Sequence, residues 1–433
     1  MKTAAFYTLG CKVNQYETEA MSEIFCKNGY TILNFDEACD VYVINTCTVT
    51  SIGDRKSRQM IRRAKHLNPD AIVAVVGCYS QVSPEEVAKI EGVNIILGTK
   101  DRKNLCEIAD KMLAEKTHGE KITDVENALK NREYEELEIK EYAEKTRAFV
   151  KIEDGCNEFC TYCIIPFARG PVRSRKLENI VKEVKYLAEK GFCEVVLTGI
   201  HIASYGKDLK TSTLADVICA VAETDGIERI RLGSLEPRIL TEEFIKRIAG
   251  TKKVCNHFHI SLQSGCDETL KRMNRKYTAA EYENSVNLLR RYFENPAIAT
   301  DIMVGFPGET DEEFAKSLAF MEKIAFADAH VFSYSNRKGT KADVMENQID
   351  PKVKEKRHKA MESTVQRLKN EYLSGMTGKK LNVLFEQEIS PNVYEGTAEN
   401  YAKVVMKSDT DISKKCLNVK IIKSENGLLT AEI

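Results

Sequence analysis

The chain has 433 residues, a length that suits roughly two to four domains with separate cores. Its 64 lysines and arginines nearly balance its 65 aspartates and glutamates, which excludes nucleic-acid binding through a uniformly basic surface and leaves only a local site. No apolar run reaches the roughly 18 residues of a membrane span, and the amino terminus lacks the pattern of a cleaved signal. We expect a soluble, cytoplasmic protein without a membrane partner.

Alternating apolar runs and helical patterns over residues 1–114 predict a parallel α/β domain. Its expected strands are 4–9, 41–45, 72–76 and 94–97. The next segment, 115–145, is dense in charge and poor in apolar periodicity, which predicts a solvated linker or an exposed helix. The first domain boundary is therefore placed there.

A second αβ series over residues 146–372 predicts an open (β/α)6 barrel, with the functional loops at one rim. Its expected strands are 149–152, 194–197, 229–232, 257–262, 297–304 and 329–333. After a long helical pattern at 352–373, short alternating strands such as 381–385, 402–406 and 417–422 predict a small β-barrel over 373–433. The predicted fold class is thus α/β with a terminal β-barrel.

Cysteine is plentiful, with 14 residues. In a chain of this size without a secretion signal, clustered cysteines indicate metal binding or catalysis rather than a disulfide framework. Thiolates, which bind iron or zinc, remain available in a reducing cytosol. Two groups of three stand out, and we expect packing roles for the other eight. The two groups are Cys11, Cys47 and Cys78, and Cys156, Cys160 and Cys163.

The second group lies on one loop directly after the first strand of the barrel series. An iron–sulfur cube needs four ligands, so three cysteines leave one iron open for another ligand. A structural zinc is the alternative, although zinc favours a closed set of four ligands and no fourth ligand is adjacent. The spacing therefore favours an iron–sulfur cluster with one open position.

The CxxxCxxC run from Cys156 to Cys163, with Tyr162 before the last cysteine, resembles the signature of the radical S-adenosylmethionine enzymes. The resemblance implies a four-iron, four-sulfur cluster whose open iron binds S-adenosylmethionine and whose electron cleaves it to a 5′-deoxyadenosyl radical. It also implies that rim residues contact this cofactor. The candidates are Thr198, Gly199, Ser234, Glu236, Gln263, Gly305 and Glu309.

Cys11, Cys47 and Cys78 each follow a predicted parallel strand. The carboxyl ends of such strands meet at one edge of the sheet, where ligands bind, so a second metal site is plausible. Unrelated buried cysteines are the alternative, because cysteine is among the most buried residue types.

The motifs around these cysteines, at 10–17, 45–49 and 76–79, resemble the three signatures of the methylthiotransferase family, and the similarity spans the chain. It implies a second four-iron, four-sulfur cluster with an open iron that handles the inserted sulfur. One S-adenosylmethionine would methylate that sulfur and another would yield the radical. The resemblance also implies a reductant protein such as flavodoxin or ferredoxin, and a sulfur donor.

Within this family, Lys12 and Val13 resemble the branch that acts on N6-threonylcarbamoyladenosine beside the tRNA anticodon. The isopentenyladenosine branch typically has glutamine and methionine there, and the branch acting on a ribosomal-protein aspartate has proline and lysine. Both remain alternatives. Lys12 also offers a cation to the threonylcarbamoyl carboxylate.

The last domain resembles the TRAM-like, RNA-binding β-barrel of these enzymes, which implies contact with the tRNA anticodon stem-loop. The candidates for phosphate or substrate contact are Arg169, Arg173 and Arg175, because a guanidinium group binds an oxyanion through two parallel hydrogen bonds. A non-enzymatic iron–sulfur electron carrier or sensor would explain the cysteines, but not the barrel loops or the RNA-binding domain.

Overall fold

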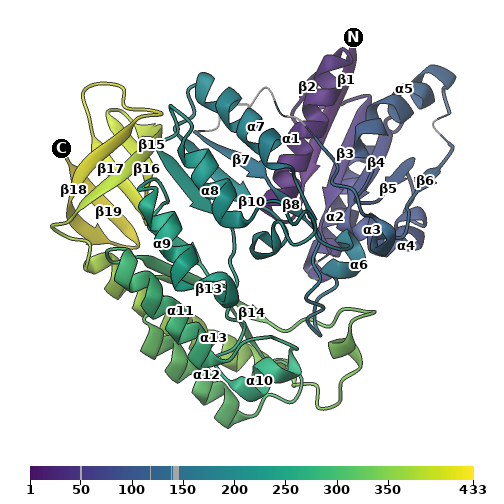
Figure 1. Ribbon diagram of the computed structural model, residues 1–433. Coiled ribbons are helices and arrows are strands. Elements are labelled where there is room, and N and C mark those ends of the chain that lie inside the picture. Colours follow the sequence, from purple (N-terminus) through teal and green to yellow (C-terminus); the bar gives the residue numbers. More distant parts are fainter. Residues whose placement is uncertain (49–50, 118, 138, 140–145) are drawn as a thin grey trace.

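The computed structural model describes residues 1–48, 51–117, 119–137, 139 and 146–433. Val49 of the second motif and part of the expected linker lie outside the described residues. The N-terminal and C-terminal domains lie on opposite sides of a central domain (Figure 1). The predicted fold class, two parallel α/β units and a closed terminal barrel, is confirmed. Among the described residues, no helix is long and apolar enough to cross a membrane.

The N-terminal domain is a six-stranded parallel sheet in the order β2-β1-β3-β4-β5-β6. Its strands are β1 Lys2–Thr8, β2 Tyr30–Leu33, β3 Val41–Thr46, β4 Ile72–Gly77, β5 Ile95–Leu97 and β6 Ile122–Asp124. Its helices are α1 Lys12–Lys27, α2 Ser51–Leu67, α3 Cys78–Val82, α4 Pro84–Ala88 and α5 Leu105–Glu115. Every residue of β3 and β4 is buried, as expected for central strands covered on both faces.

The four predicted strands of this sheet are confirmed, and the structure adds β2 and β6 at its edges. Edge strands are short and only partly buried, so they carry little hydrophobic pattern. The sixth strand lies in the segment that charge density assigns to a linker. Leu137 and Ile139 of that segment are also buried, against Tyr16 and Ala20 of α1.

The central domain has six parallel strands in two three-stranded sheets, β7-β10-β11 and β12-β13-β14. Two isolated bridges, Ile230 with Val254 and Leu235 with Ile260, link the segments around β11 and β12. The strands are β7 Arg147–Lys151, β10 Glu194–Thr198, β11 Arg229–Leu232, β12 His257–His259, β13 Ala297–Val304 and β14 Asp328–Ser333, with a small β8 Glu153–Asp154 and β9 Arg173–Ser174 pair. The helices are α6 Ile165–Arg169, α7 Leu177–Glu189, α8 Leu214–Ala222, α9 Glu242–Gly250, α10 Asp267–Arg272, α11 Ala279–Tyr292, α12 Asp311–Ile324 and α13 Pro351–Ser374. All six predicted strands are confirmed.

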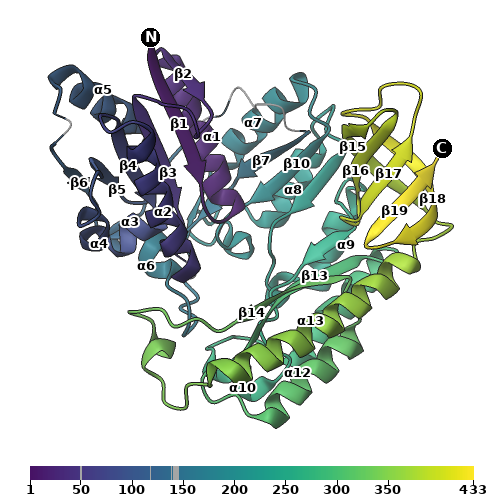
Figure 2. The same ribbon diagram turned by 180° about the vertical axis from the view of Figure 1, so that it is seen from behind.

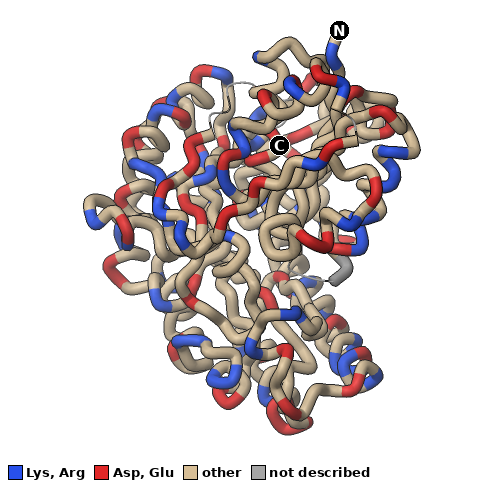
Figure 3. The backbone as a smooth tube through the Cα atoms, turned by 90° about the vertical axis from the view of Figure 1, so that its right-hand side faces the viewer, with Lys and Arg blue, Asp and Glu red and all other residues tan. Residues whose placement is uncertain are grey.

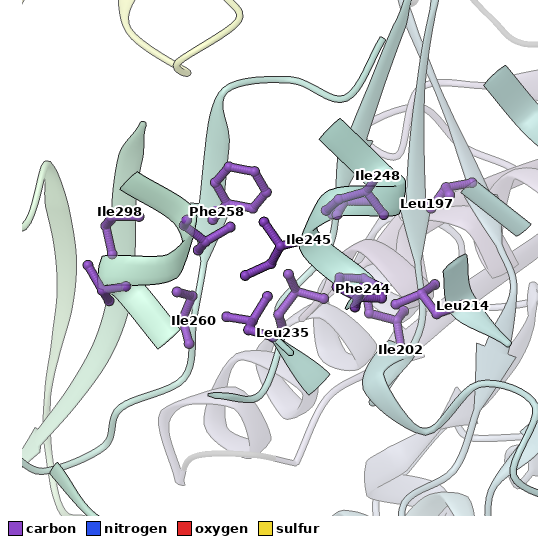
Figure 4. Close-up of a cluster of buried hydrophobic side chains, with 14 of the residues drawn as sticks. Leu197, Ile202, Leu214, Leu235, Phe244, Ile245, Ile248, Phe258, Ile260 and Ile298 are labelled. Carbon is purple, nitrogen blue, oxygen red and sulfur yellow. The ribbon is translucent and has the colours of Figure 1, made fainter. Parts of the chain in front are cut away.

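Local sequence signals and side-chain packing agree in this domain. Thr213, Thr278 and Thr310 each form a capping box with an acidic residue three positions later, at the starts of α8, α11 and α12. Leu197 of β10 and Phe258 of β12 gather with helix residues in a fully buried cluster (Figure 4). Burial of such side chains contributes roughly 1.5 to 3 kcal/mol each.

The C-terminal domain is a closed barrel in the order β15-β16-β17-β19-β18. Its strands are β15 Lys380–Ser390, β16 Val393–Ala398, β17 Lys403–Lys407, β18 Cys416–Glu425 and β19 Leu428–Glu432. In Figure 2, α13 runs beside α12 and ends at this barrel. Arg229 and Arg231 of β11 both pair with Glu194 of β10 and donate to backbone carbonyls of the barrel. The Cys193 and Cys416 sulfurs also meet across this boundary, 3.1 Å apart.

A buried charge network joins the N-terminal and central domains. Glu17 of α1 is fully buried, and its carboxylate binds Lys151 Nζ at 2.7 Å and Arg169 Nη1 at 2.5 Å. Arg102 pairs with the same carboxylate, and Asp154 pairs with Lys151 at 2.6 Å. Burial alone would raise the pKa of Glu17, but Arg102, Arg169 and Lys151 lower it to about 2.

We predict that Glu17→Gln lowers the free energy of unfolding by about 3 kcal/mol, because three cations would stay buried with too little negative charge. Since the pKa of Glu17 falls from 4.5 to about 2 on folding, the difference from wild type should be full above pH 4.5 and shrink as the pH falls toward 2. Urea unfolding at several pH values measures it. Glu355→Gln, which removes an exposed ion pair on α13, is the control and should change nothing measurable. Equal effects of both substitutions would contradict the prediction.

Candidate active site

The first cysteine group lies at one edge of the N-terminal sheet. Cys11, Cys47 and Cys78 follow the adjacent strands β1, β3 and β4 directly or within three residues of their ends. Gly10 has a φ of +105°, and a Cβ there would lie 2.9 Å from the Cys47 sulfur. Glycine therefore lets the turn before Cys11 approach Cys47 closely.

An arginine of the central domain reaches this group. Arg169 Nε donates to the Cys78 sulfur at 3.3 Å, and its Nη2 donates to Asn14 Oδ1 at 2.6 Å. Burial raises the pKa of Cys78 to about 12, and the charge of Arg169 opposes this rise. A buried thiolate of this kind needs a metal or another cation close by.

The second group lies on the loop after β8. Cys156 donates its backbone N–H to Gly170 at 3.0 Å, and Cys163 donates to Cys160 at 3.0 Å, which folds the loop back on itself. Arg275 Nη1 donates to the Cys160 sulfur at 3.2 Å. This arginine, like Arg169 at the first group, provides positive charge beside sulfur.

The two groups face one another across the domain boundary. Burial is the main reason that the pKa of Cys163 rises to about 12, and the neighbouring sulfurs of Cys160 and Cys78 add to it. Cys78 of the N-terminal domain begins α3, and Cys163 of the central domain lies two residues before α6. The helices that follow the two groups, α3 and α6, also lie side by side (Figures 1 and 2).

This donor set fits iron–sulfur clusters. Each group offers three thiols, with an arginine hydrogen-bonded to one of the sulfurs, and hydrogen bonds to sulfur are a recognised feature of such sites. A structural zinc would take four protein ligands. Each group could hold a four-iron, four-sulfur cluster and leave one iron without a cysteine.

Four of the residues expected to contact the cofactor lie at the end of β10 or in the loops after β10 and β11. Thr198 ends β10 and is buried. Gly199 packs so closely on Glu153 that a Cβ would lie 2.8 Å from its Oε2. Glu236 is buried and paired with Arg238 at 2.8 Å. Ser234 instead lines a cavity formed by residues of all three domains.

The loops after β12 and β13 place the other expected residues. Gln263 has a φ of +68° and bonds through its backbone to Asp301. Gly305 has a φ of +70° and donates to Glu309 Oε2 at 2.7 Å. The Glu309 carboxylate also accepts from Arg357 at 2.8 Å. The buried Glu309 carboxylate thus holds this turn to α13, and its expected place in the cofactor pocket stays a prediction.

Two rim residues escaped the sequence analysis. Glu158, His201 and Glu236 have ligand atoms within 4.8 Å of one another, and Arg238 joins Glu158 at 2.9 Å. Burial lowers the pKa of His201, so it is neutral at physiological pH. The sequence signal for His201 was its position two residues after Gly199, a residue already expected at the cofactor pocket. Glu158 occupies one of the unspecified positions of the CxxxCxxC motif, so the sequence offered no signal for it.

The three arginines expected to contact RNA are buried in ion pairs instead. Arg169, Arg173 and Arg175 are each 3% exposed or less. Arg169 binds Glu17, Arg173 lies 3.4 Å from Asp154, and Arg175 pairs with carboxylates of the central domain and the preceding segment. Their predicted contact with phosphate is wrong, because the carboxylates already occupy the guanidinium groups.

A cavity of about 370 Å³ lies where the three domains meet. Lys12 from the N-terminal domain, His257 from β12 and Tyr401 from the C-terminal barrel all line it. Over the chain as a whole, acidic and basic residues are interspersed (Figure 3). The nearly neutral net charge of the chain therefore does not reveal this local group of cations. His257 stacks on Tyr401 there.

Comparisons with known proteins agree with this architecture. The radical SAM superfamily matches residues 150–321, and the uncharacterized protein family UPF0004 matches residues 3–98. Among solved structures, the radical S-adenosylmethionine methyltransferase TsrM of Kitasatospora setae has a TM-score of 0.58 and 16% identity, over 79% of this chain and 77% of that chain. This likeness shows the fold.

Curated relatives are similar over nearly the whole length. Threonylcarbamoyladenosine tRNA methylthiotransferase MtaB of Bacillus subtilis is 43% identical over 98% of this chain and 94% of its own. A tRNA-2-methylthio-N(6)-dimethylallyladenosine synthase of Clostridium botulinum is 35% identical over 98% of this chain and 95% of its own. With both domain types and this identity throughout, the chain belongs to the radical SAM methylthiotransferase family.

Proposed function

We propose that the enzyme converts N6-threonylcarbamoyladenosine at position 37 of tRNA into its 2-methylthio derivative. The relative named for this nucleoside is 43% identical, against 35% for the one named for dimethylallyladenosine. The observation that carries the proposal is the packing of α3 and α6, the helices at the two cysteine groups, across the domain boundary, and Lys12 directly follows Cys11 in the sequence. Hydrogen removal and sulfur insertion at one carbon need both sites within reach of it.

The family uses S-adenosylmethionine and two four-iron, four-sulfur clusters. When bound, these cofactors supply the radical that removes the hydrogen and the sulfur and methyl group that replace it. We assign one cluster to the group from Cys156 to Cys163 and the other to Cys11, Cys47 and Cys78. Arg275 and Arg169 then offset the negative charge of the sulfurs to which they donate.

The rim residues have a binding role in this proposal. Glu236 and His201 gather with Glu158 of the second cluster loop, and Gly199 precedes His201 by two residues. An amino acid group with adjacent amine and carboxylate suits such a set, because buried polar groups need fixed partners. Thr198, Gln263 and Gly305 shape the same rim through their backbone.

Lys12 favours the threonylcarbamoyl substrate among the family's alternatives. An isopentenyl group has no charge to pair with a half-buried lysine, whereas a threonylcarbamoyl group carries a carboxylate. A ribosomal-protein aspartate would also bring a carboxylate, and it is the second candidate. The partners in this proposal are the tRNA anticodon stem-loop, a reductant such as flavodoxin or ferredoxin, and a sulfur donor, all in the cytoplasm.

Deletion of the gene should abolish 2-methylthio-N6-threonylcarbamoyladenosine in total tRNA and leave its unmethylthiolated precursor in its place. Nucleoside mass spectrometry of hydrolysed tRNA measures both. Re-expression of the wild-type gene should restore the product, and a Cys156→Ala copy should not. If the product persists in the deletion strain, or if the isopentenyl counterpart disappears instead, the proposed substrate is wrong.

Anaerobic reconstitution should give about eight irons per chain, four for each cluster. Replacing Cys11, Cys47 and Cys78 together with alanine should leave about four, and replacing Cys156, Cys160 and Cys163 should also leave about four. Iron analysis with absorption spectroscopy measures the content. Cys26→Ala, at an exposed site on α1, is the control and should retain about eight. A triple variant that keeps the full content would refute the ligand assignment.

A further inference from the structure

The cavity between the three domains contains one cation that forms no ion pair with the residues the structure describes. Four lysines and arginines line it, and three of them already bind carboxylates. Those pairs are Arg147 with Glu386 (3.2 Å), Lys369 with Asp328 (2.8 Å) and Lys403 with Glu395 (3.1 Å). The fourth is Lys12, which forms no ion pair with any residue that the structure describes. Its charge is therefore available to an anion that enters the cavity.

The electrostatic environment around Lys12 is positive. Lys12 and Arg147 line the cavity together, and Arg231 lies beside the ring of Tyr401, which lines the same cavity. Burial alone would raise the pKa of Tyr401, yet Lys12, Arg147 and Arg231 lower it. A bound carboxylate would offset this excess of positive charge.

Tyr401 stands at the centre of this group. Its ring centre lies 5.9 Å from Lys12 Nζ, 5.8 Å from Arg147 Cζ and 4.8 Å from Arg231 Cζ. It also stacks on His257, with the ring centres 4.7 Å apart. The residue is nonetheless 42% exposed, so part of this tyrosine remains accessible among the cations.

The backbone holds Tyr401 in a costly conformation. Its φ is +71°, which is rare for a bulky residue and usually persists only where the surroundings impose it. Arg231 donates to the carbonyl of Ala398 at 3.2 Å, and Arg229 donates to that of Thr397 at 3.1 Å. The central domain therefore fixes the barrel loop that carries Tyr401.

His257 supplies a second unpaired group. Its Nδ1 is buried and has no hydrogen-bond partner among the described residues, although buried polar groups are nearly always satisfied. Burial keeps its pKa well below the usual value, so the ring is neutral. A ligand with a carboxylate and neutral polar groups would satisfy both Lys12 and His257.

We propose that this cavity receives the threonylcarbamoyl arm of the substrate. The carboxylate of the arm pairs with Lys12, and the arm itself packs against Tyr401. The C-terminal barrel then takes part in choosing the modified base, beyond general RNA contact. This inference rests on the proposed function. The volume of about 370 Å³ lies within the range of small-ligand sites, roughly 300 to 1,000 Å³. An isopentenyl arm would leave Lys12 and His257 unpaired.

The test is binding of short anticodon stem-loop RNAs to the cluster-loaded enzyme, followed by fluorescence anisotropy under anaerobic conditions. The three RNAs carry N6-threonylcarbamoyladenosine, its methyl ester or plain adenosine. Wild type should bind the carboxylate form about tenfold more tightly than the ester, the lower end for a hydrogen bond to a charged group. Lys12→Met and Tyr401→Ala should remove this preference, and Tyr401→Phe should retain it because the ring remains.

Lys407→Met, which removes an exposed cation from the same barrel, is the matched control and should keep the tenfold ratio. The inference is overturned if Lys12→Met or Tyr401→Ala preserves the ratio, or if Tyr401→Ala weakens all three RNAs equally. Iron content shows whether each variant is folded and loaded. Product formation by wild type is measured in parallel. Failure of wild type to modify the RNA that carries N6-threonylcarbamoyladenosine rejects the proposed function. Normal product formation, with a tenfold binding ratio that Lys12→Met or Tyr401→Ala leaves unchanged, rejects only this inference.

Discussion

The contact of Arg169 with Glu17 and Cys78 is the constraint on which the two-site arrangement depends. Arg169 ends α6, the helix that follows the Cys156–Cys163 loop, and it reaches into the N-terminal domain to a carboxylate and a sulfur. A buried guanidinium tolerates little displacement, because each lost hydrogen bond would leave a charge unpaired in a low-dielectric interior. Arg169 therefore ties the two cysteine groups to one another, together with the Lys151–Glu17 pair across the same boundary.

Chemistry at a single carbon explains why this separation matters. Removal of a hydrogen and attachment of sulfur must occur at the same atom, so groups on two domains have to meet around one base. The cavity beside Lys12 extends the same logic to recognition. The N-terminal domain supplies a cation beside Cys11, the central domain supplies His257, and the barrel supplies Tyr401.

Features that depend on local spacing could be predicted from the sequence. The six barrel strands, the central strands of the first sheet and the capped helices all follow from periodicity and short motifs. The meeting of Cys11, Cys47 and Cys78 follows from the rule that parallel strands end at one edge. The edge strands β2 and β6 could not be found in this way, because short, partly exposed strands leave little pattern.

Features that depend on domain packing could not be predicted. Arg169, Arg173 and Arg175 were expected to reach RNA because nothing in their local sequence shows the carboxylates that bury them. Tyr401 and Lys12 lie almost a full chain length apart, and only the folded molecule brings them together. Motif position was a sound guide to the cluster loop and a poor guide to where a charged side chain points.

The most direct test of the central claim is a competition experiment with the reconstituted enzyme. Equal amounts of two anticodon stem-loops, one with N6-threonylcarbamoyladenosine and one with N6-isopentenyladenosine, are incubated together with S-adenosylmethionine and a reductant, and the nucleosides are measured by mass spectrometry. The account predicts that the methylthio group appears on the threonylcarbamoyl nucleoside. Equal or greater conversion of the isopentenyl nucleoside would contradict it.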